Sequence, residues 1–226
     1  MATLYGANVV RDGLVLHLDA ANVKSYPGSG TVWNGLTGNE SNGLLVNGAA
    51  YFSNNEGYIA FDGVNDYASI ETSNDISGNN PWTISIWANV SSSENSSGRQ
   101  GWLIWQGTSN QTTNQLISMG VTSGAIEIAH WGNDTTFTNA AVDFNQWEQY
   151  VCTYDGTTEK VYVNGIQKAS KTTSLSITAG TWYISSRAGV AEFLNNSVSS
   201  FQVYNRSISD SEIQQNFNAT RGRFGI

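Results

Sequence analysis

Apolar and polar residues alternate with a period of two along most of this sequence, and the alternation restricts the chain to β-strands. Side chains of a strand point to opposite faces in turn, so every second residue shares a face. Leu14, Leu16 and Leu18 share one face of Gly13–Asp19 in this way. The same pattern marks residues 82–90, 102–106, 116–121, 126–131, 161–163 and 201–203.

Short turn signals separate these segments and indicate antiparallel pairing. Asn164-Gly165 lies between two strand-like runs and is typical of a type I′ hairpin. Asp155-Gly156 ends the preceding strand. Many short strands with frequent turns predict one all-β domain over residues 1–226, an antiparallel β-sandwich of the jelly-roll type. Composition by itself does not separate such a sandwich from a barrel.

One helix is predicted, near the end of the sequence. Ser209 is a good N-cap, and Glu212 three residues later completes a capping box. Ile213 and Phe217 lie four residues apart and therefore share a helix face. We expect a short helix over about Asp210–Ala219 that packs on the sandwich and closes it.

The charge of the chain argues against one class of partner. Only 12% of the 226 residues are Asp, Glu, Lys or Arg, and the net charge is −8 at neutral pH. The ten basic residues form no stripe, so the sequence lacks the basic surface that a phosphate backbone requires. We therefore expect no nucleic-acid partner.

The start of the sequence predicts synthesis in a cytoplasm. Residues 1–5 carry neither the basic nor the apolar stretch of a signal peptide. No apolar run approaches the roughly 20 residues of a membrane-spanning helix, so no membrane insertion is expected. If the protein acts outside a cell, we expect it to leave by another route, such as release inside an assembled particle.

Three stretches resemble the laminin-G-like branch of the concanavalin A-like lectin/glucanase superfamily. Ile59–Tyr67 contains Phe-Asp-Gly-Val-Asn-Asp-Tyr and is similar to that family's Phe-Asp-Gly-x-Asp-Asp-Tyr signature. Trp147–Gly165 resembles the paired strands that the family joins around a Tyr-Asp-Gly turn. Val198–Ser209 resembles its closing strand and short helix. The resemblance implies a concanavalin A-like jelly roll.

The two ends of the sequence resemble domains of this kind in virion proteins of tailed phages. The opening is Gly13–Asn22 followed by Ser25–Gly30, and the ending is Asn216–Ile226. The resemblance implies a structural protein of a particle. We therefore expect a non-catalytic virion protein on the particle surface, either a capsid decoration protein or a tail or fibre component. Its expected partners are other virion proteins and further copies of itself.

No catalytic motif accompanies these resemblances. Glucanases of the superfamily carry Glu-x-Asp-x-Glu on one strand, which places the carboxylates on one face as nucleophile and acid. Here no Glu is followed two residues later by Asp, and the helix cap explains the spacing of Asp210 and Glu212. We expect no enzyme activity. The second hypothesis is a lectin for cell-surface polysaccharide, and the third is a polysaccharide hydrolase.

The lone cysteine and the two histidines form no metal or nucleophile pattern. Cys152 lies in a strand pattern, where a small buried apolar residue is expected. His17 and His130 lack the spacing of a zinc site, so each is expected to be a hydrogen-bonded strand histidine.

Asp62, Asn65 and Asp66 are the candidate metal ligands. They supply hard oxygens in a glycine-containing turn. Laminin-G-like domains often bind calcium at a sheet rim, so the resemblance implies Ca²⁺ as the one candidate cofactor. The alternative is that Asp62 and Asn65 satisfy backbone amides of the turn while Asp66 is solvated.

Tryptophans beside planar polar groups are the candidate glycan contacts, because indole faces stack on sugar rings. Trp131, Asn133 and Asp134 form the best local cluster, and Trp102 and Trp105 form the second. The alternative is that these tryptophans belong to the core, since a large sandwich buries most of its aromatic residues.

The final segment, Arg221–Ile226, contains Arg221, Arg223 and Phe224 and is short for an element of its own. We expect a docking tail, placed either on the sandwich or on a neighbouring subunit. Its deletion is expected to leave folding nearly intact and to weaken assembly.

Overall fold

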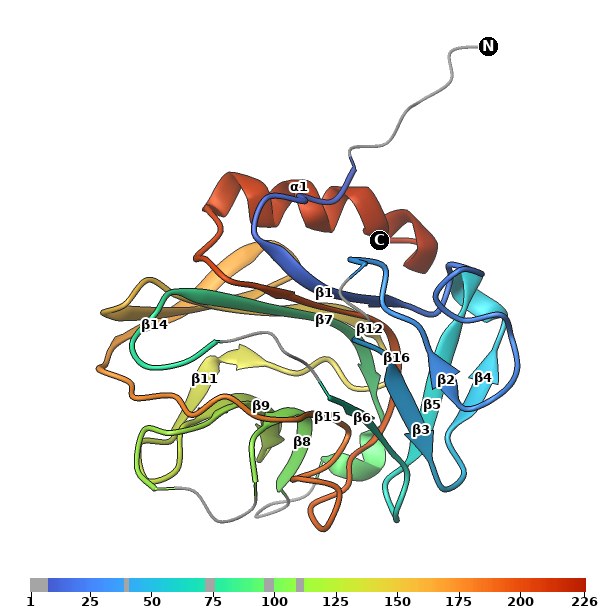
Figure 1. Cartoon of the computed structure of the whole chain (residues 1–226), viewed down its shortest axis with the longest axis horizontal. Coiled ribbons are helices and arrows are strands. Elements are labelled where there is room, and N and C mark those ends of the chain that lie inside the picture. The colour runs from blue at the N-terminus through green and yellow to red at the C-terminus, as the bar shows by residue number, and fades with distance from the viewer. Residues whose placement is uncertain (1–7, 39–40, 72–75, 96–99, 109–111) are drawn as a thin grey trace.

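The computed structural model forms two antiparallel sheets that face each other, with one helix on the outside of the first (Figure 1). This is the β-sandwich that the alternation predicts. Residues 1–7, on which the expectation about export rests, lie outside the described part of the chain. The structure describes residues 8–38, 41–71, 76–95, 100–108 and 112–226.

The first sheet, sheet A, has eight strands in the order β14, β13, β12, β7, β16, β5 and β4, with β1 also paired to β16. One edge of β16 holds two neighbours, because β1 pairs with residues 200–204 and β5 with residues 195–198. The strands are β1 (Leu14–Asp19), β4 (Ala50–Phe52), β5 (Tyr58–Asp62), β7 (Trp82–Val90), β12 (Trp147–Tyr154), β13 (Thr158–Val163), β14 (Ile166–Thr172) and β16 (Asn195–Tyr204).

The second sheet, sheet B, also has eight strands, in the order β11, β10, β9, β8, β15, β6, β3 and β2. Its neighbours are antiparallel throughout. The strands are β2 (Val32–Trp33), β3 (Gly43–Val46), β6 (Tyr67–Ile70), β8 (Gln100–Gln106), β9 (Ile117–Thr122), β10 (Ala125–Ala129), β11 (Thr135–Ala141) and β15 (Trp182–Ile184).

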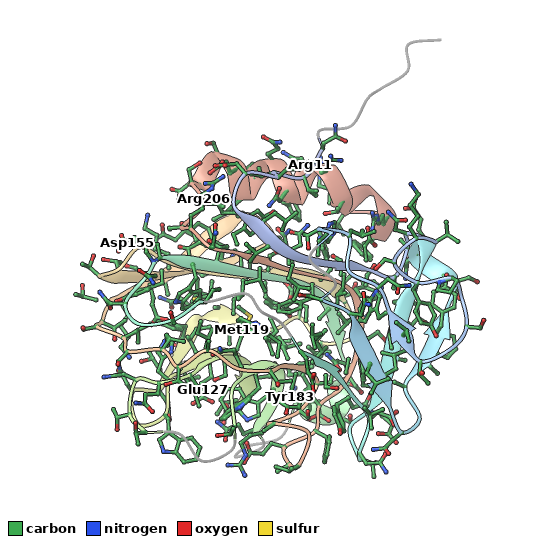
Figure 2. All side chains as sticks on the ribbon, viewed as in Figure 1. Arg11, Met119, Glu127, Asp155, Tyr183 and Arg206 are labelled. Carbon is green, nitrogen blue, oxygen red and sulfur yellow. The ribbon has the colours of Figure 1, made fainter. Side chains whose placement is uncertain are left out.

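Alternation along the strands divides the core from the outer faces. Ile84 and Ile86 of β7 are fully buried between the sheets, while the next residue, Trp87, points to the outer face and stacks on the Phe217 ring. Met119 of β9 lies between the two sheets (Figure 2) and is also fully buried. The predicted inward faces of residues 82–90 and 161–163 are therefore confirmed.

Leu14 departs from its predicted face. The register of β1 against β16 shifts between Leu14 and Leu16, which marks a β-bulge. Leu16 and Leu18 lie in the core, whereas Leu14 packs with Tyr204 on the helix side of sheet A. A bulge adds one residue to a strand and reverses the side on which later residues point, and local alternation cannot reveal it.

The predicted hairpin and helix are both present. Asn164 and Gly165 have φ of 52° and 76°, as a type I′ turn requires, and they join β13 to β14. Helix α1 (Asp210–Thr220) begins with the predicted capping box: Ser209 caps it, and the Ser209 backbone N donates to Glu212 Oε2 at 2.8 Å.

Helix α1 lies on the outer face of sheet A (Figure 1), with Ile213 fully buried and Phe217 9% exposed. Among the described residues, no helix combines the length and the apolar character needed to cross a membrane. The short 3₁₀ helices are η1 (Asn54–Glu56), η2 (Ser92–Glu94) and η3 (Arg221–Phe224).

Candidate ligand-binding site

A small cavity lies on the outer face of sheet B, the face turned away from sheet A and α1. Its volume is about 100 Å³. Figure 2 labels Tyr183 and Glu127 on this side of the molecule. Four of the five predicted glycan-contact residues line the cavity, and the structure thereby brings the two predicted tryptophan clusters together. The lining residues are Gln100, Trp102, Trp105, Ala129, Trp131, Asp134, Arg187 and Glu192.

A β-bulge places Trp102 and Trp105 on the same face of β8. Residues three apart in a regular strand point to opposite faces. The register of β8 against β9 shifts between Trp102 and Ile104, which marks a β-bulge with one extra residue. Because of this extra residue, Trp102 and Trp105 point to the same face. Both indoles pack in an aromatic cluster outside the main core, with ring centroids 5.0 Å apart.

Gly120 of β9 provides the space for the Trp102 ring. A Cβ at this position would lie 2.7 Å from Trp102 Cε3 and 2.7 Å from the Gly101 carbonyl oxygen. The indole therefore approaches the backbone of the neighbouring strand more closely than any side chain at position 120 would allow. Trp102 is 3% exposed and Trp105 is 2% exposed. Both are therefore buried, as the alternative predicts, although they lie in a cluster outside the main core.

Trp131 comes to the cavity from the tight turn between β10 and β11. Its φ is 63°, a left-handed conformation that is uncommon for a bulky residue. The turn is held by Asp134, whose Oδ1 accepts a hydrogen bond from the His130 backbone N at 3.1 Å. The Trp131 ring is half-buried and meets the Trp105 ring at 85°, with centroids 6.4 Å apart.

The loop between β15 and β16 supplies the opposite wall. Trp102 Nε1 donates to Glu192 Oε2 at 2.6 Å, and Arg187 Nε lies 3.2 Å from the same oxygen. Ala188 and Glu192 have φ of 51° and 49°, so this wall also contains left-handed residues that are not glycine. Strained residues of this kind are held by their surroundings and concentrate at functional sites.

The predicted contact Asn133 does not reach the cavity. Its side chain bonds Asn114 Oδ1 and Thr173 Oγ1, each at 2.7 Å, and accepts from Lys171 Nζ at 2.6 Å. These bonds give Asn133 a structural role in joining neighbouring loops.

Sequence reasoning missed Gln100, Arg187 and Glu192. The turn-like Ala188-Gly189 pair indicates a loop at this point, but nothing local shows which strands the loop covers. Its position depends on the sheet order, because β15 lies beside β8.

His130, next to Trp131, forms a buried pair with Glu159 of sheet A. Nδ1 lies 2.7 Å from the Leu116 carbonyl oxygen, which can only accept, so Nδ1 carries a hydrogen. Nε2 lies 2.6 Å from Glu159 Oε1, and both side chains are at most 1% exposed. One proton is therefore shared between Nε2 and the carboxyl. Both ring nitrogens are hydrogen-bonded, as expected, although His130 lies one residue beyond the end of β10 and not within the strand.

The remaining isolated residues also have structural surroundings. His17 Nε2 accepts from Gln202 Nε2 at 3.3 Å, and burial lowers the pKa of this histidine. Cys152 is fully buried, and burial raises the pKa of its thiol well above the ordinary value. This agrees with the expected role of Cys152 as a small apolar residue.

The candidate calcium ligands are occupied by backbone amides. Asp62 Oδ1 accepts from the backbone N of Val64 at 2.8 Å and of Asn65 at 3.3 Å. The Val64 bond is the main cause of the lowered pKa of Asp62. Asp66 is buried rather than solvated, and its carboxylate accepts from Gly48 N at 2.6 Å and Asp62 N at 3.3 Å.

The carboxylates of Asp62 and Asp66 therefore fit a calcium ion poorly, because their bonds hold the turn and leave few oxygens to converge on one point. In the described part of the chain, no group of three or more His, Cys, Asp or Glu side chains is placed to hold a metal.

The predicted tail is folded onto the sandwich of its own chain, as helix η3. The Phe224 ring stacks on Trp87 and Trp147, with centroid separations of 4.3 and 4.7 Å. Arg223 forms two hydrogen bonds to the buried carboxylate of Asp19, at 2.8 and 3.0 Å. The expectation that this segment forms no element of its own is wrong, because these aromatic and ionic contacts order it.

Arg221 has a lesser part in this packing. Its guanidinium lies over the Phe217 ring of α1, 5.8 Å from the ring centroid.

A wider hollow of about 630 Å³ lies where α1 begins, but its charged groups are largely paired with one another. The Arg206 guanidinium bonds both carboxylate oxygens of Glu212 at 2.9 and 2.6 Å. Tyr162 OH donates to Asp210 Oδ1 at 2.7 Å. These contacts fasten α1 to sheet A, so the cavity among the tryptophans is the better candidate site.

Residues 62–214 match the laminin-G-type model of the concanavalin A-like lectin/glucanases superfamily. The match covers more than half of the sequence, so the chain belongs to this superfamily, as the resemblance predicts. No curated protein matches the sequence significantly.

Solved structures with the same fold include binding domains of toxins. The binding domain of Paraclostridial Mosquitocidal Protein 1 is similar with a TM-score of 0.71 and 17% identity, over 91% of this chain and 52% of that chain. The botulinum neurotoxin serotype D binding domain gives a TM-score of 0.72 and 14% identity, over 91% and 51%. The chain thus spans about half the length of these domains.

An enzyme also contains a similar unit. Trypanosoma rangeli sialidase gives a TM-score of 0.69 and 18% identity, over 96% of this chain and 34% of the sialidase. At these identities the likeness concerns the fold alone.

Proposed function

We propose that the protein is a non-catalytic structural protein of a phage virion, exposed on the particle surface as a capsid decoration protein or a tail- or fibre-associated module. The observation that carries this proposal is the position of the two ends. The stretches that resemble tailed-phage virion proteins, Gly13–Asn22 and Asn216–Ile226, meet at sheet A, where Arg223 Nη1 donates to Asp19 Oδ1 at 2.8 Å.

Residues beside these two stretches add further contacts. Val10 N donates to Asn216 Oδ1 at 2.7 Å, and Gln215 Nε2 donates to the Asn8 carbonyl oxygen at 2.7 Å. The bidentate pair between Arg223 and Asp19 joins η3 to β1. The surface formed by β1, α1 and η3 on sheet A suits docking onto a particle, because docking there leaves the outer face of sheet B free for other contacts.

A non-catalytic role is supported by the sequence. The Glu-x-Asp-x-Glu pattern of the superfamily's glucanases is absent.

Mass spectrometry of gradient-purified particles tests the virion role. We expect this chain at a fixed ratio to the major capsid or tail proteins, and we expect an antibody against it to bind intact particles. A chain present in infected cells but missing from purified particles would end the proposal.

The second candidate is carbohydrate binding at the outer face of sheet B, favoured by the three tryptophans gathered at one cavity. Binding domains of toxins share the fold, which is consistent with a role in attachment. The partner proposed here is a glycan of the host surface.

A glycan array tests this candidate with the wild type and two variants. Trp131→Ala removes the half-buried indole of the cavity, and Trp147→Ala is the control, a half-buried tryptophan on sheet A. We expect the first to abolish any glycan signal and the second to preserve it. A signal that is equal in all three proteins would place glycan binding elsewhere.

A further inference from the structure

Three tryptophans in different orientations line the cavity on sheet B; Trp131 is half-buried, whereas Trp102 and Trp105 are 3% and 2% exposed. The Trp102 and Trp105 rings meet at 70°, and the Trp105 and Trp131 rings meet at 85°. A sugar-binding platform presents one broad face. Steeply inclined indoles instead enclose a compact group from several sides, which is how aromatic cages hold quaternary ammonium ions.

The size of the cavity also favours a compact group. An apolar cavity of about 150 Å³ accommodates benzene, which has six heavy atoms. A cavity of about 100 Å³ therefore suits a group of four or five heavy atoms. A trimethylammonium group meets this limit, whereas a whole hexose ring does not.

Most polar groups at the cavity are paired with one another, and one carboxylate is available to a positive ligand. The Trp102 N–H is used by Glu192, and the Arg187 guanidinium pairs with the same carboxylate, while the buried Trp105 Nε1 has no hydrogen-bond partner among the described residues. Asp134 is exposed, and within the described residues only Oδ1 of its carboxylate accepts a hydrogen bond. The half-buried Trp131 indole and the Asp134 carboxylate both attract a cation, and a methylated ammonium needs no hydrogen-bond partner.

The walls of the cavity are held in place before any ligand arrives. Trp131, Ala188 and Glu192 all have left-handed backbone conformations, and hydrogen bonds at Asp134 and Trp102 fix two of the walls. Such preorganisation lowers the cost of ordering a site on binding.

We propose that this cavity binds a methylated ammonium group of the choline or betaine class, carried by the surface to which the protein attaches. The inference rests on the attachment role proposed for the outer face of sheet B and names the chemical group recognised there.

Isothermal titration of the full chain with choline chloride tests the proposal directly. Its matched probe is 3,3-dimethylbutan-1-ol, which has the same shape without the charge. We expect choline to bind at least about tenfold more tightly than the neutral alcohol, because cation–π attraction depends on the charge. Equal affinities, or no heat with choline at about 50 mM, would overturn the proposal.

Two variants locate the binding. Asp134→Asn keeps the Oδ1 acceptor for the His130 amide and removes the charge, so we expect about threefold to tenfold weaker choline binding. Trp131→Ala should weaken it at least about tenfold. Asp155→Asn is the control, because Asp155 also caps a turn through Oδ1 but lies between β12 and β13 of sheet A and does not line the cavity.

Thermal melts of each variant show whether it is folded. If Trp131→Ala fails to fold, Asp134→Asn alone decides the question, and unchanged choline affinity in that variant overturns the proposal. Binding of unmodified glycans without choline binding also overturns it and leaves the carbohydrate candidate standing. The virion role is tested separately by particle composition.

Discussion

At the scale of single residues, the buried pair of His130 and Glu159 joins the two sheets through one shared proton. The geometry demands a donor on one side of the 2.6 Å contact, because Nδ1 of the imidazole is already committed to the Leu116 carbonyl. The effect of a substitution at Glu159 on stability therefore depends on whether the new side chain can donate a hydrogen bond to His130 Nε2.

We expect Glu159→Gln to destabilise the protein less than Glu159→Leu. Glutamine can donate its amide hydrogen to Nε2, whereas leucine leaves that buried nitrogen without a partner, at a cost of about 1–3 kcal/mol. Urea unfolding of both variants measures the difference. Equal stabilities would show that the hydrogen bond contributes nothing to folding.

At the scale of elements, helix α1 depends more on its buried face than on its cap. Phe217 stacks on Trp87 with centroids 5.7 Å apart, while Ser209 completes a capping box at the exposed helix start. Loss of a buried phenylalanine costs about 3–5 kcal/mol, and loss of a cap about 1 kcal/mol.

We therefore expect Phe217→Ala to destabilise the domain more than Ser209→Ala. Chemical denaturation of the two variants and the wild type gives the free energies of unfolding. The reverse order would mean that the helix packs on sheet A more loosely than the stacked rings indicate.

The start of α1 also gives the protein a dependence on acid. Hydrogen bonding to the Arg206 guanidinium lowers the pKa of Glu212 to about 2. In an unfolded chain the pKa of glutamate is about 4.3, so the folded state takes up this proton at a lower pH than the unfolded state does. The stabilising contribution is fully present above about pH 4.3 and is lost as the pH falls toward about 2.

In Glu212→Gln this contribution is absent at every pH. We expect the stability gap between wild type and variant to be wide at about pH 6 and to close at about pH 2.5, as urea midpoints at several pH values will show. A gap that stays constant across this range would contradict the assignment.

At the scale of the whole molecule, the end of the chain is part of the fold. Deleting residues 221–226 uncovers the Trp87 and Trp147 rings and leaves the buried Asp19 carboxylate without Arg223. We expect a loss of about 2 kcal/mol or more in unfolding free energy. This revises the sequence-based expectation that folding stays nearly intact.

Deletion of Gly225 and Ile226 alone is the matched control, because both residues are exposed and lie beyond η3. Thermal melts of both truncated proteins test the prediction. If both melt like the wild type, η3 does not contribute to the fold.

Metal ions provide a second test of the whole molecule. A ligand that binds the native state raises the melting temperature by mass action. Because amides occupy the oxygens of Asp62 and Asp66, we expect about 5 mM calcium, or a chelator, to shift the melting temperature by less than about 1 °C. A clear rise with calcium would restore the metal site.

Features with a local cause could be predicted from the sequence. Strand positions follow from a period of two, the 164–165 turn from Asn-Gly chemistry, and the start of α1 from the reciprocal bonds of Ser209 and Glu212. Each depends on residues a few positions apart. The two-sheet fold and the superfamily could therefore be predicted.

Which distant residues come into contact depends on how the strands pair in the fold. The bulges in β1 and β8 depend on the pairing with β16 and β9, and they decide the sides on which Leu14 and Trp102 lie. The cavity joins β8, the Trp131 turn and the loop at Glu192, segments that the order of the strands brings together. A period in the sequence carries no information on such pairings, because a register shift of one residue reverses every later side chain.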